Sequence, residues 1–270
     1  MKRLPYFLLF LLYFFSLFTV VATVELTGYQ DFLWKMTQEN GFFESLTVLI
    51  LFTICLYGIG VLYRSKSSLP KPVFWLVILI TLLTFLAGME EISWGQQLFH
   101  FSSSDYFIEN NLQQETNLHN FVDANLFSSL IYVTIYTFFV FIPLLYKCCF
   151  KGVSRLRYFD LEMHHILIVL FSSSFQLYFY DDLGVYADMV TQWIGLILFL
   201  YVLWREKGDL WLKLHYVTVV GATLILMFYH DIFEFKNMQY EIREMFVTLA
   251  FLFIYVRFIR RESPNGKKSV

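Results

Sequence analysis

The sequence predicts an all-α polytopic membrane protein, a bundle of about eight transmembrane helices with both termini in the cytoplasm. Three observations favour this fold class: an apolar composition, eight apolar segments close to membrane-crossing length, and an uneven distribution of basic residues. Of the 270 residues, 58% are hydrophobic and only 16% are charged, whereas soluble domains carry about a quarter charged residues. The solvent of most side chains is therefore expected to be lipid.

The charge balance also limits the partners. The net charge is -2, and the 12 glycines form no phosphate-binding loop or dinucleotide fingerprint. We expect membrane lipids as partners and no nucleic acid, and the sequence identifies no protein partner.

A helix needs about 20 apolar residues to cross roughly 30 Å of hydrocarbon. The candidate spans are residues 4–24, 42–63, 73–91, 126–146, 163–180, 185–204, 212–229 and 245–259. They predict one transmembrane domain over residues 1–262, with a polar outer loop at 99–125 and a cytoplasmic tail at 263–270. Pro70 and Pro72 precede the third span, where a missing N–H does no harm to a helix.

The positions of lysine and arginine set the predicted orientation, because short cytoplasmic segments are enriched in both. If the N-terminus is cytoplasmic, only Lys35, Lys236 and Arg243 among the 20 basic residues fall on the outer side. This predicts a protein of the cell (inner) membrane. Alternatively, Lys2 and Arg3 with the apolar run behind them form a cleaved signal peptide, which would leave seven spans.

The acidic residues show the opposite bias, and two of them end the third span. Glu90 and Glu91 lie about 26 Å along the helix from Val73, near the outer edge of the hydrocarbon. Ionisable residues at that depth normally face a protein interior or a wet cavity. Glu90, Trp94 and Gln97 are expected to share one face of the helix.

These residues and the polar loop predict a functional site on the outer face, made of carboxylates and imidazoles. The candidate catalytic residues are Glu90, Glu91 and His119. The candidate ligands of a divalent metal, the only cofactor suggested, are Glu44, Glu90, Glu91, Glu115, His119 and His230. Polar support is expected from Trp94, Gln97, Asn117, Asn120 and Asp181. A site at headgroup depth favours acid–base or metal-dependent chemistry on a lipid-linked substrate.

Three stretches resemble a family of uncharacterised multi-pass bacterial membrane proteins. They are Glu39–Thr47 before and within the second span, Gly88–Gln97 with the motif EEISWGQ, and Asn111–Asn120 with the motif NLQxETNLHN. The resemblance implies a helical membrane bundle and lends no activity.

Four other interpretations stay open. In the first, Glu90 and Glu91 brace the long loop by hydrogen bonds to its amides. In the second, the chain is a small-molecule transporter, for which the spans offer only uncharged polar residues such as Ser172–Ser174, Gln176, Thr191 and Gln192. In the third, His164 or His165 and His215 ligate a haem. In the fourth, the polar loop is the contact surface of a non-catalytic assembly protein.

Overall fold

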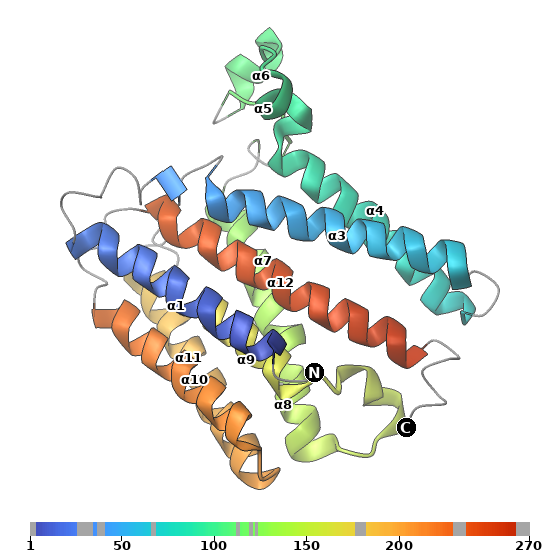
Figure 1. The fold of residues 1–270 in the computed structure, drawn as a ribbon, viewed down its shortest axis with the longest axis vertical. Helices are drawn as coiled ribbons and strands as arrows, with labels where there is room; N and C mark the ends of the chain where they lie inside the picture. The colour runs from blue at the N-terminus through green and yellow to red at the C-terminus, as the bar shows by residue number, and fades with distance from the viewer. Residues whose placement is uncertain are drawn as a thin grey trace. The chain divides into compact units, whose positions relative to one another are not determined.

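The computed structural model describes residues 4–25, 35–36, 41–65, 69–111, 114–118, 121, 124–175, 182–228 and 236–262. These residues form helices and no strand (Figure 1). The predicted all-α fold class is therefore confirmed for the described part of the chain.

Helices lie at each of the predicted spans. The long helices are α1 (Leu4–Glu25), α3 (Phe42–Ser65), α4 (Lys71–Glu91), α7 (Ala124–Tyr136), α9 (Met163–Ser172), α10 (Asp182–Arg205), α11 (Leu210–Phe228) and α12 (Lys236–Glu262). The shorter helices are η1 (Ser93–Gly95), α5 (Gln96–Phe99), α6 (Asp105–Asn110), η3 (Thr137–Phe141), α8 (Ile142–Leu145), η4 (Tyr146–Phe150) and η5 (Ser154–Phe159). The fifth predicted span ends outside the description, at residues 176–181.

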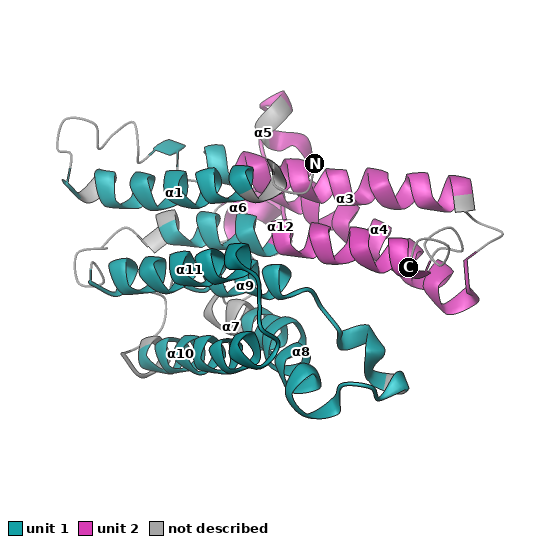
Figure 2. Cartoon of the chain, turned by 60° about the horizontal axis from the view of Figure 1, so that its bottom comes forward, with its two compact units in different colours: residues 1–43, 130–247 teal, residues 44–129, 248–270 magenta. Residues whose placement is uncertain are grey.

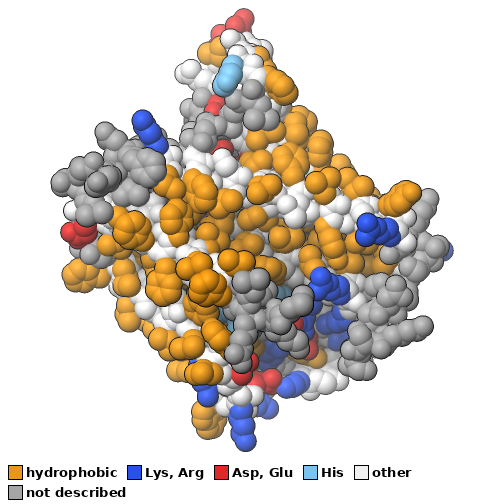
Figure 3. Space-filling view, in the orientation of Figure 1, with side chains coloured by type: hydrophobic (Ala, Val, Ile, Leu, Met, Phe, Trp, Pro, Cys, Tyr) orange, Lys and Arg blue, Asp and Glu red, His pale blue; other side chains and the backbone are white. Residues whose placement is uncertain are grey.

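Among the described residues, five helical segments are long and apolar enough to cross a membrane. They are Phe42–Arg64, Lys71–Glu91, Leu130–Phe150, Tyr186–Arg205 and Leu210–Phe228. Many large hydrophobic side chains on the helices are exposed, among them Phe14, Phe18 and Leu82, and Figure 3 shows such side chains over much of one face. Exposed apolar surface of this extent fits a membrane protein.

Helix α12 differs from the sequence prediction, because it begins at Lys236 rather than at residue 245. In the sequence, the charged residues Glu241, Arg243 and Glu244 lie immediately before the apolar run that predicts the last span. The structure continues the helix through them and buries Arg243 completely. A charged side chain that is paired with other residues inside the protein can lie within a buried helix.

The chain divides into two compact units (Figure 2). Unit 1 is Met1–Phe43 with Leu130–Val247, and unit 2 is Glu44–Ser129 with Thr248–Val270. In unit 2, α3, α4 and the C-terminal part of α12 share a core that includes Ile54, Val77 and Tyr255. The close approach of α3 and α4 depends on Gly58, where a Cβ would lie 2.1 Å from Thr81 Oγ1.

Unit 1 packs α1, α7, α9, α10, α11 and the N-terminal part of α12 around buried aromatic rings. Tyr13 stacks on Phe171 with ring centroids 3.7 Å apart, and Phe246 meets Phe171 edge-on at 4.7 Å. At one end of the unit, ion pairs join Lys147 to Asp160 at 2.6 Å and Lys151 to Glu206 at 2.5 Å. The unit thus has an apolar aromatic centre and a charged end.

Candidate functional site

Helix α4 ends at Glu91 because the residues after it leave the right-handed helical region. Ser93, Trp94 and Gly95 have φ values of 46°, 54° and 90°. The predicted continuous face through Gln97 is therefore wrong, and the Gln97 side chain lies outside the described residues. Trp94 still reaches the helix, since its Nε1 donates to Glu90 Oε1 at 2.6 Å.

The carboxylate of Glu90 joins the helix end to the polar loop. Its other oxygen, Oε2, accepts a hydrogen bond from the backbone N–H of Leu118 at 2.6 Å. A carboxylate accepts such bonds more strongly than a neutral group does. One side chain therefore holds two segments that are far apart in the sequence.

A second carboxylate, that of Glu115, makes the matching contact from the loop. Ser93 Oγ donates to Glu115 Oε2 at 2.5 Å, and Asn117 Nδ2 donates to the same oxygen at 3.1 Å. Asn117 is 1% exposed and also accepts hydrogen bonds from Asn111 Nδ2 at its backbone and side-chain oxygens. We call the folded segment of residues 93–111 and 114–118 the head.

Gln96 completes the network of the head. Its Oε1 accepts a hydrogen bond from Thr116 N at 2.8 Å and another from Ser103 Oγ at 3.1 Å. Through Glu90, Ser93 and Gln96, the EEISWGQ motif thus binds the loop motif that contains Glu115, Thr116 and Asn117. These are contacts of the kind that the bracing interpretation predicts.

The remaining predicted site residues are only partly described. Glu44 is buried in the first turn of α3, and Glu91 is half-buried at the end of α4. His119, Asn120, Asp181 and His230 lie outside the described residues. Within the described ranges, no three His, Cys, Asp or Glu side chains are grouped to hold a metal ion. The catalytic and metal-binding roles stay predictions.

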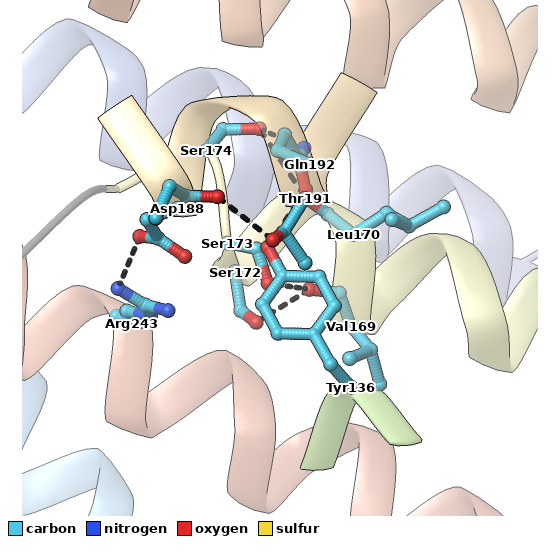
Figure 4. Close-up of polar contacts among 11 residues, drawn as sticks. Tyr136, Val169, Leu170, Ser172, Ser173, Ser174, Asp188, Thr191, Gln192 and Arg243 are labelled. Carbon is cyan, nitrogen blue, oxygen red and sulfur yellow. Dashed lines mark hydrogen bonds and ion pairs between the residues drawn. The ribbon is translucent and has the colours of Figure 1, made fainter. Parts of the chain in front are cut away.

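Unit 1 contains a second polar site that the sequence analysis did not predict, centred on Arg243 (Figure 4). Its guanidinium is fully buried, donates from Nη1 to Asp188 Oδ2 at 3.2 Å, and lies 3.6 Å from the centroid of the Tyr132 ring. The three side chains come from α12, α10 and α7. Ion pairing and cation–π attraction together offset the cost of burying the charge.

One edge of this guanidinium has no acceptor among the described residues. Arg243 Nε and Nη2 are buried, and neither has a hydrogen-bond partner there. Buried donors are normally satisfied. The N–H groups of Nε and Nη2 point in the same direction, which is the geometry that holds two oxygens of a carboxylate or phosphate.

Uncharged polar side chains continue inside the same unit. Gln192 is 0% exposed and accepts a hydrogen bond from Tyr136 Oη at 3.1 Å. Its Nε2 donates to Leu170 O at 2.8 Å and contacts Ser174 and Thr223, whose hydroxyls lie 2.8 Å from each other. The network ties α7, α9, α10 and α11 together.

Sequence reasoning had noticed parts of this site but not their association. The sequence places Arg243 on the outer side, before the last predicted span, and Asp188 near the first residue of the sixth predicted span. The useful signal was their opposite charge at corresponding ends of two spans, since buried charges are usually paired.

Comparison with known proteins identifies no relative. No protein-family model, no curated protein and no solved structure matches the chain.

Proposed function

We propose that this chain is a multi-pass protein of the cell (inner) membrane that binds a small oxyanion among the helices of unit 1 and carries it across the membrane. The proposal includes eight spans with both termini in the cytoplasm. Its central observation is the buried Nε–Nη2 edge of Arg243, which has no acceptor among the described residues.

The chemistry of the site selects the ligand class. Burying a guanidinium is costly unless its donors are satisfied, and Asp188 satisfies only Nη1. A carboxylate or phosphate would accept two parallel charge-assisted hydrogen bonds at the remaining edge. Both a free anion and a lipid headgroup carry such a group. The ligand class is therefore an oxyanion with two adjacent acceptor oxygens.

The polar network around Gln192 supports transport rather than static binding. Ionisable and polar side chains inside membrane bundles are costly, and they mark the paths of ions and substrates. The ring of Tyr132, which lies 3.6 Å from the Arg243 guanidinium, is one helical turn from Tyr136 on α7, and Tyr136 Oη donates a hydrogen bond to Gln192 Oε1. We infer a polar route that starts at Arg243 and continues between the helices.

The alternative function, an acid–base or metal-dependent enzyme at the outer face, stays a prediction for Glu90, Glu91 and His119. The geometry supports it less well. Both oxygens of Glu90 already accept hydrogen bonds from the protein, from Trp94 and Leu118. These two bonds fix the carboxylate against the protein, which is what the bracing interpretation requires.

The test is anion binding by the purified full chain. Thermal unfolding and calorimetry would be measured with phosphate, acetate and succinate in delipidated detergent samples, and with phosphatidic acid against phosphatidylcholine in nanodiscs. We expect Arg243→Lys to weaken binding by about 10- to 100-fold, because one N–H pair is lost, and Arg243→Gln to abolish it. Stabilisation by free phosphate or by phosphatidic acid alone distinguishes the two ligand sources.

Arg260→Gln is the matched control, since Arg260 lies exposed on the same helix. It should bind like the wild type. Size-exclusion profiles and helical circular dichroism establish that each variant is folded. Equal anion binding by wild type and a folded Arg243→Gln variant would exclude the proposed site. Uptake of the bound anion into proteoliposomes then tests transport, and binding without uptake would refute the carrier function.

A further inference from the structure

A glutamine on α12 shares the unusual feature of the Arg243 guanidinium, a buried donor without an acceptor. Gln239 is 1% exposed, and its Nε2 has no hydrogen-bond partner among the described residues. Buried amide groups are normally satisfied, because a donor taken out of water without a new partner loses its hydrogen bonds to water. The Gln239 amide is therefore a second buried donor in unit 1 that is available to a ligand.

Helical geometry brings the Gln239 amide and the guanidinium together. Gln239 and Arg243 are four residues apart on α12, so they lie on one face of the helix, one turn apart. Helical side chains lean toward the N-terminus, so the Arg243 side chain runs over the preceding turn, which contains Gln239. Glu241 and Glu244 lie two residues and one residue from Arg243 and do not share this face. The unpartnered nitrogens of Gln239 and Arg243 thus belong to one site.

Other helices close this site on one side of the guanidinium. Asp188 on α10 accepts from Arg243 Nη1 at 3.2 Å (Figure 4), and the Tyr132 ring on α7 lies 3.6 Å from the guanidinium. Neither residue contacts the Nε–Nη2 edge through a hydrogen bond. Gln239 lies in the first turn of α12, and the partial positive charge at the start of a helix favours an anion there.

The number of donors selects an anion by the number of its free oxygens. A bidentate contact with Nε and Nη2 uses two oxygens of the ligand. A carboxylate has no other oxygen, and it accepts hydrogen bonds mainly in its own plane, which is the plane of the bidentate contact. Sulfate, phosphate and phosphate monoesters keep at least one further oxygen outside that plane. This oxygen is the acceptor that an amide one helical turn away requires.

From this arrangement we propose that Gln239 and Arg243 together bind a tetrahedral oxyanion with at least three free oxygens, namely sulfate, inorganic phosphate or a phosphate monoester. This inference rests on the proposed function and narrows its ligand class. Gln239 determines the specificity, because only such a ligand reaches its Nε2 while Arg243 holds two of the ligand's oxygens. Carboxylates and phosphate diesters bind through Arg243 alone and therefore more weakly.

The experiment measures anion binding to the purified full chain by calorimetry and thermal unfolding. Sulfate and succinate carry the same charge at pH 7, while methyl phosphate and dimethyl phosphate differ by one free oxygen. We expect sulfate and methyl phosphate to bind about 10- to 100-fold more tightly than succinate and dimethyl phosphate, which is the effect of one hydrogen bond to a charged group. In nanodiscs, a preference for phosphatidic acid over phosphatidylglycerol, which is a diester, would identify a lipid as the source of the monoester.

Two substitutions of Gln239 test its role. Gln239→Met removes the amide at nearly constant volume, so the variant without anion should unfold at or above the wild-type temperature. It should bind sulfate about 10- to 100-fold more weakly than the wild type and succinate equally well. Gln239→Glu places a carboxylate one turn before Arg243, where it accepts from the Nε–Nη2 edge in place of the anion. This variant should unfold at a higher temperature than the wild type and lose sulfate binding.

Gln114→Met, at an exposed position of the head, is the control and should bind sulfate like the wild type. The inference is overturned if the wild type binds succinate as tightly as sulfate, or if either folded Gln239 variant binds sulfate like the wild type. Loss of all anion binding in Arg243→Gln would in that case retain the proposed function without a role for Gln239. Equal binding by wild type and folded Arg243→Gln refutes the proposed function and this inference together.

Discussion

Glu90 and Leu118 are joined across 28 residues, because the backbone N–H of Leu118 donates to Glu90 Oε2 at 2.6 Å. The same carboxylate binds Trp94. Glu90→Ala would remove the acceptors of both hydrogen bonds, including the one from the Leu118 N–H. A hydrogen bond to a charged group contributes about 1.5–3 kcal/mol. Amide exchange at Leu118 should therefore become roughly 10- to 100-fold faster, measured by hydrogen–deuterium exchange mass spectrometry.

Glu109 provides the control for this prediction, since it lies exposed on α6 of the same head. Glu109→Ala should leave the exchange of the segment around Leu118 unchanged. The bracing role of Glu90 would be contradicted if both variants exchanged at the wild-type rate.

Alanine substitutions at Gly58 and Gly60 on α3 should have different effects on stability. A Cβ at Gly58 would lie 2.1 Å from Thr81 Oγ1 and 3.1 Å from Tyr255 Oη, whereas a Cβ at Gly60 meets no atom within 4 Å. Overpacking of this kind typically costs 1–3 kcal/mol, so we expect Gly58→Ala to lose about that much stability. Gly60→Ala should unfold at or above the wild-type temperature, since alanine favours helix. Thermal unfolding in detergent measures both, and equal midpoints would contradict the packing.

The positions of the helices could be predicted from the sequence because they depend on local composition. An apolar run such as residues 42–63 forms a helix whatever surrounds it in lipid, and α3 occupies Phe42–Ser65. The start of α12 could not be predicted in this way, because Arg243 belongs in the helix only through Asp188 and Tyr132. An average of hydropathy over neighbouring residues does not detect a partner that is distant in the sequence.

The candidate sites were predictable to a smaller degree. The EEISWGQ motif and the loop motif contain the candidate site residues Glu90, Glu115 and Asn117. The structure joins these residues in one hydrogen-bond network. Their connection depends on positive φ angles at Ser93 and Trp94, which residue type does not favour. The pairing of Asp188 with Arg243 joins residues 55 positions apart, and nothing local specifies it.

The proposed orientation predicts which side of the membrane two single cysteines occupy. Cys55, Cys148 and Cys149, all free thiols, would first be replaced by serine or alanine. Ser103→Cys in the head should then react with a membrane-impermeant maleimide in intact cells, and Ser263→Cys in the predicted tail only after permeabilisation. Labelling of both, or of neither, in intact cells would contradict the odd number of spans predicted between the two positions.

Asp188→Asn removes one partner of a buried ion pair and leaves Arg243 without a counter-charge. Loss of such a partner typically costs 3–5 kcal/mol, so the variant should unfold at a markedly lower temperature than the wild type. A bound oxyanion would supply the missing charge at the guanidinium, and added phosphate should therefore stabilise Asp188→Asn more than it stabilises the wild type. Asp105→Asn, at an exposed position of the head, controls for a general effect of charge removal. Thermal unfolding across a phosphate titration measures the difference, and an equal phosphate effect on all three proteins would show that the anion does not take the place of Asp188.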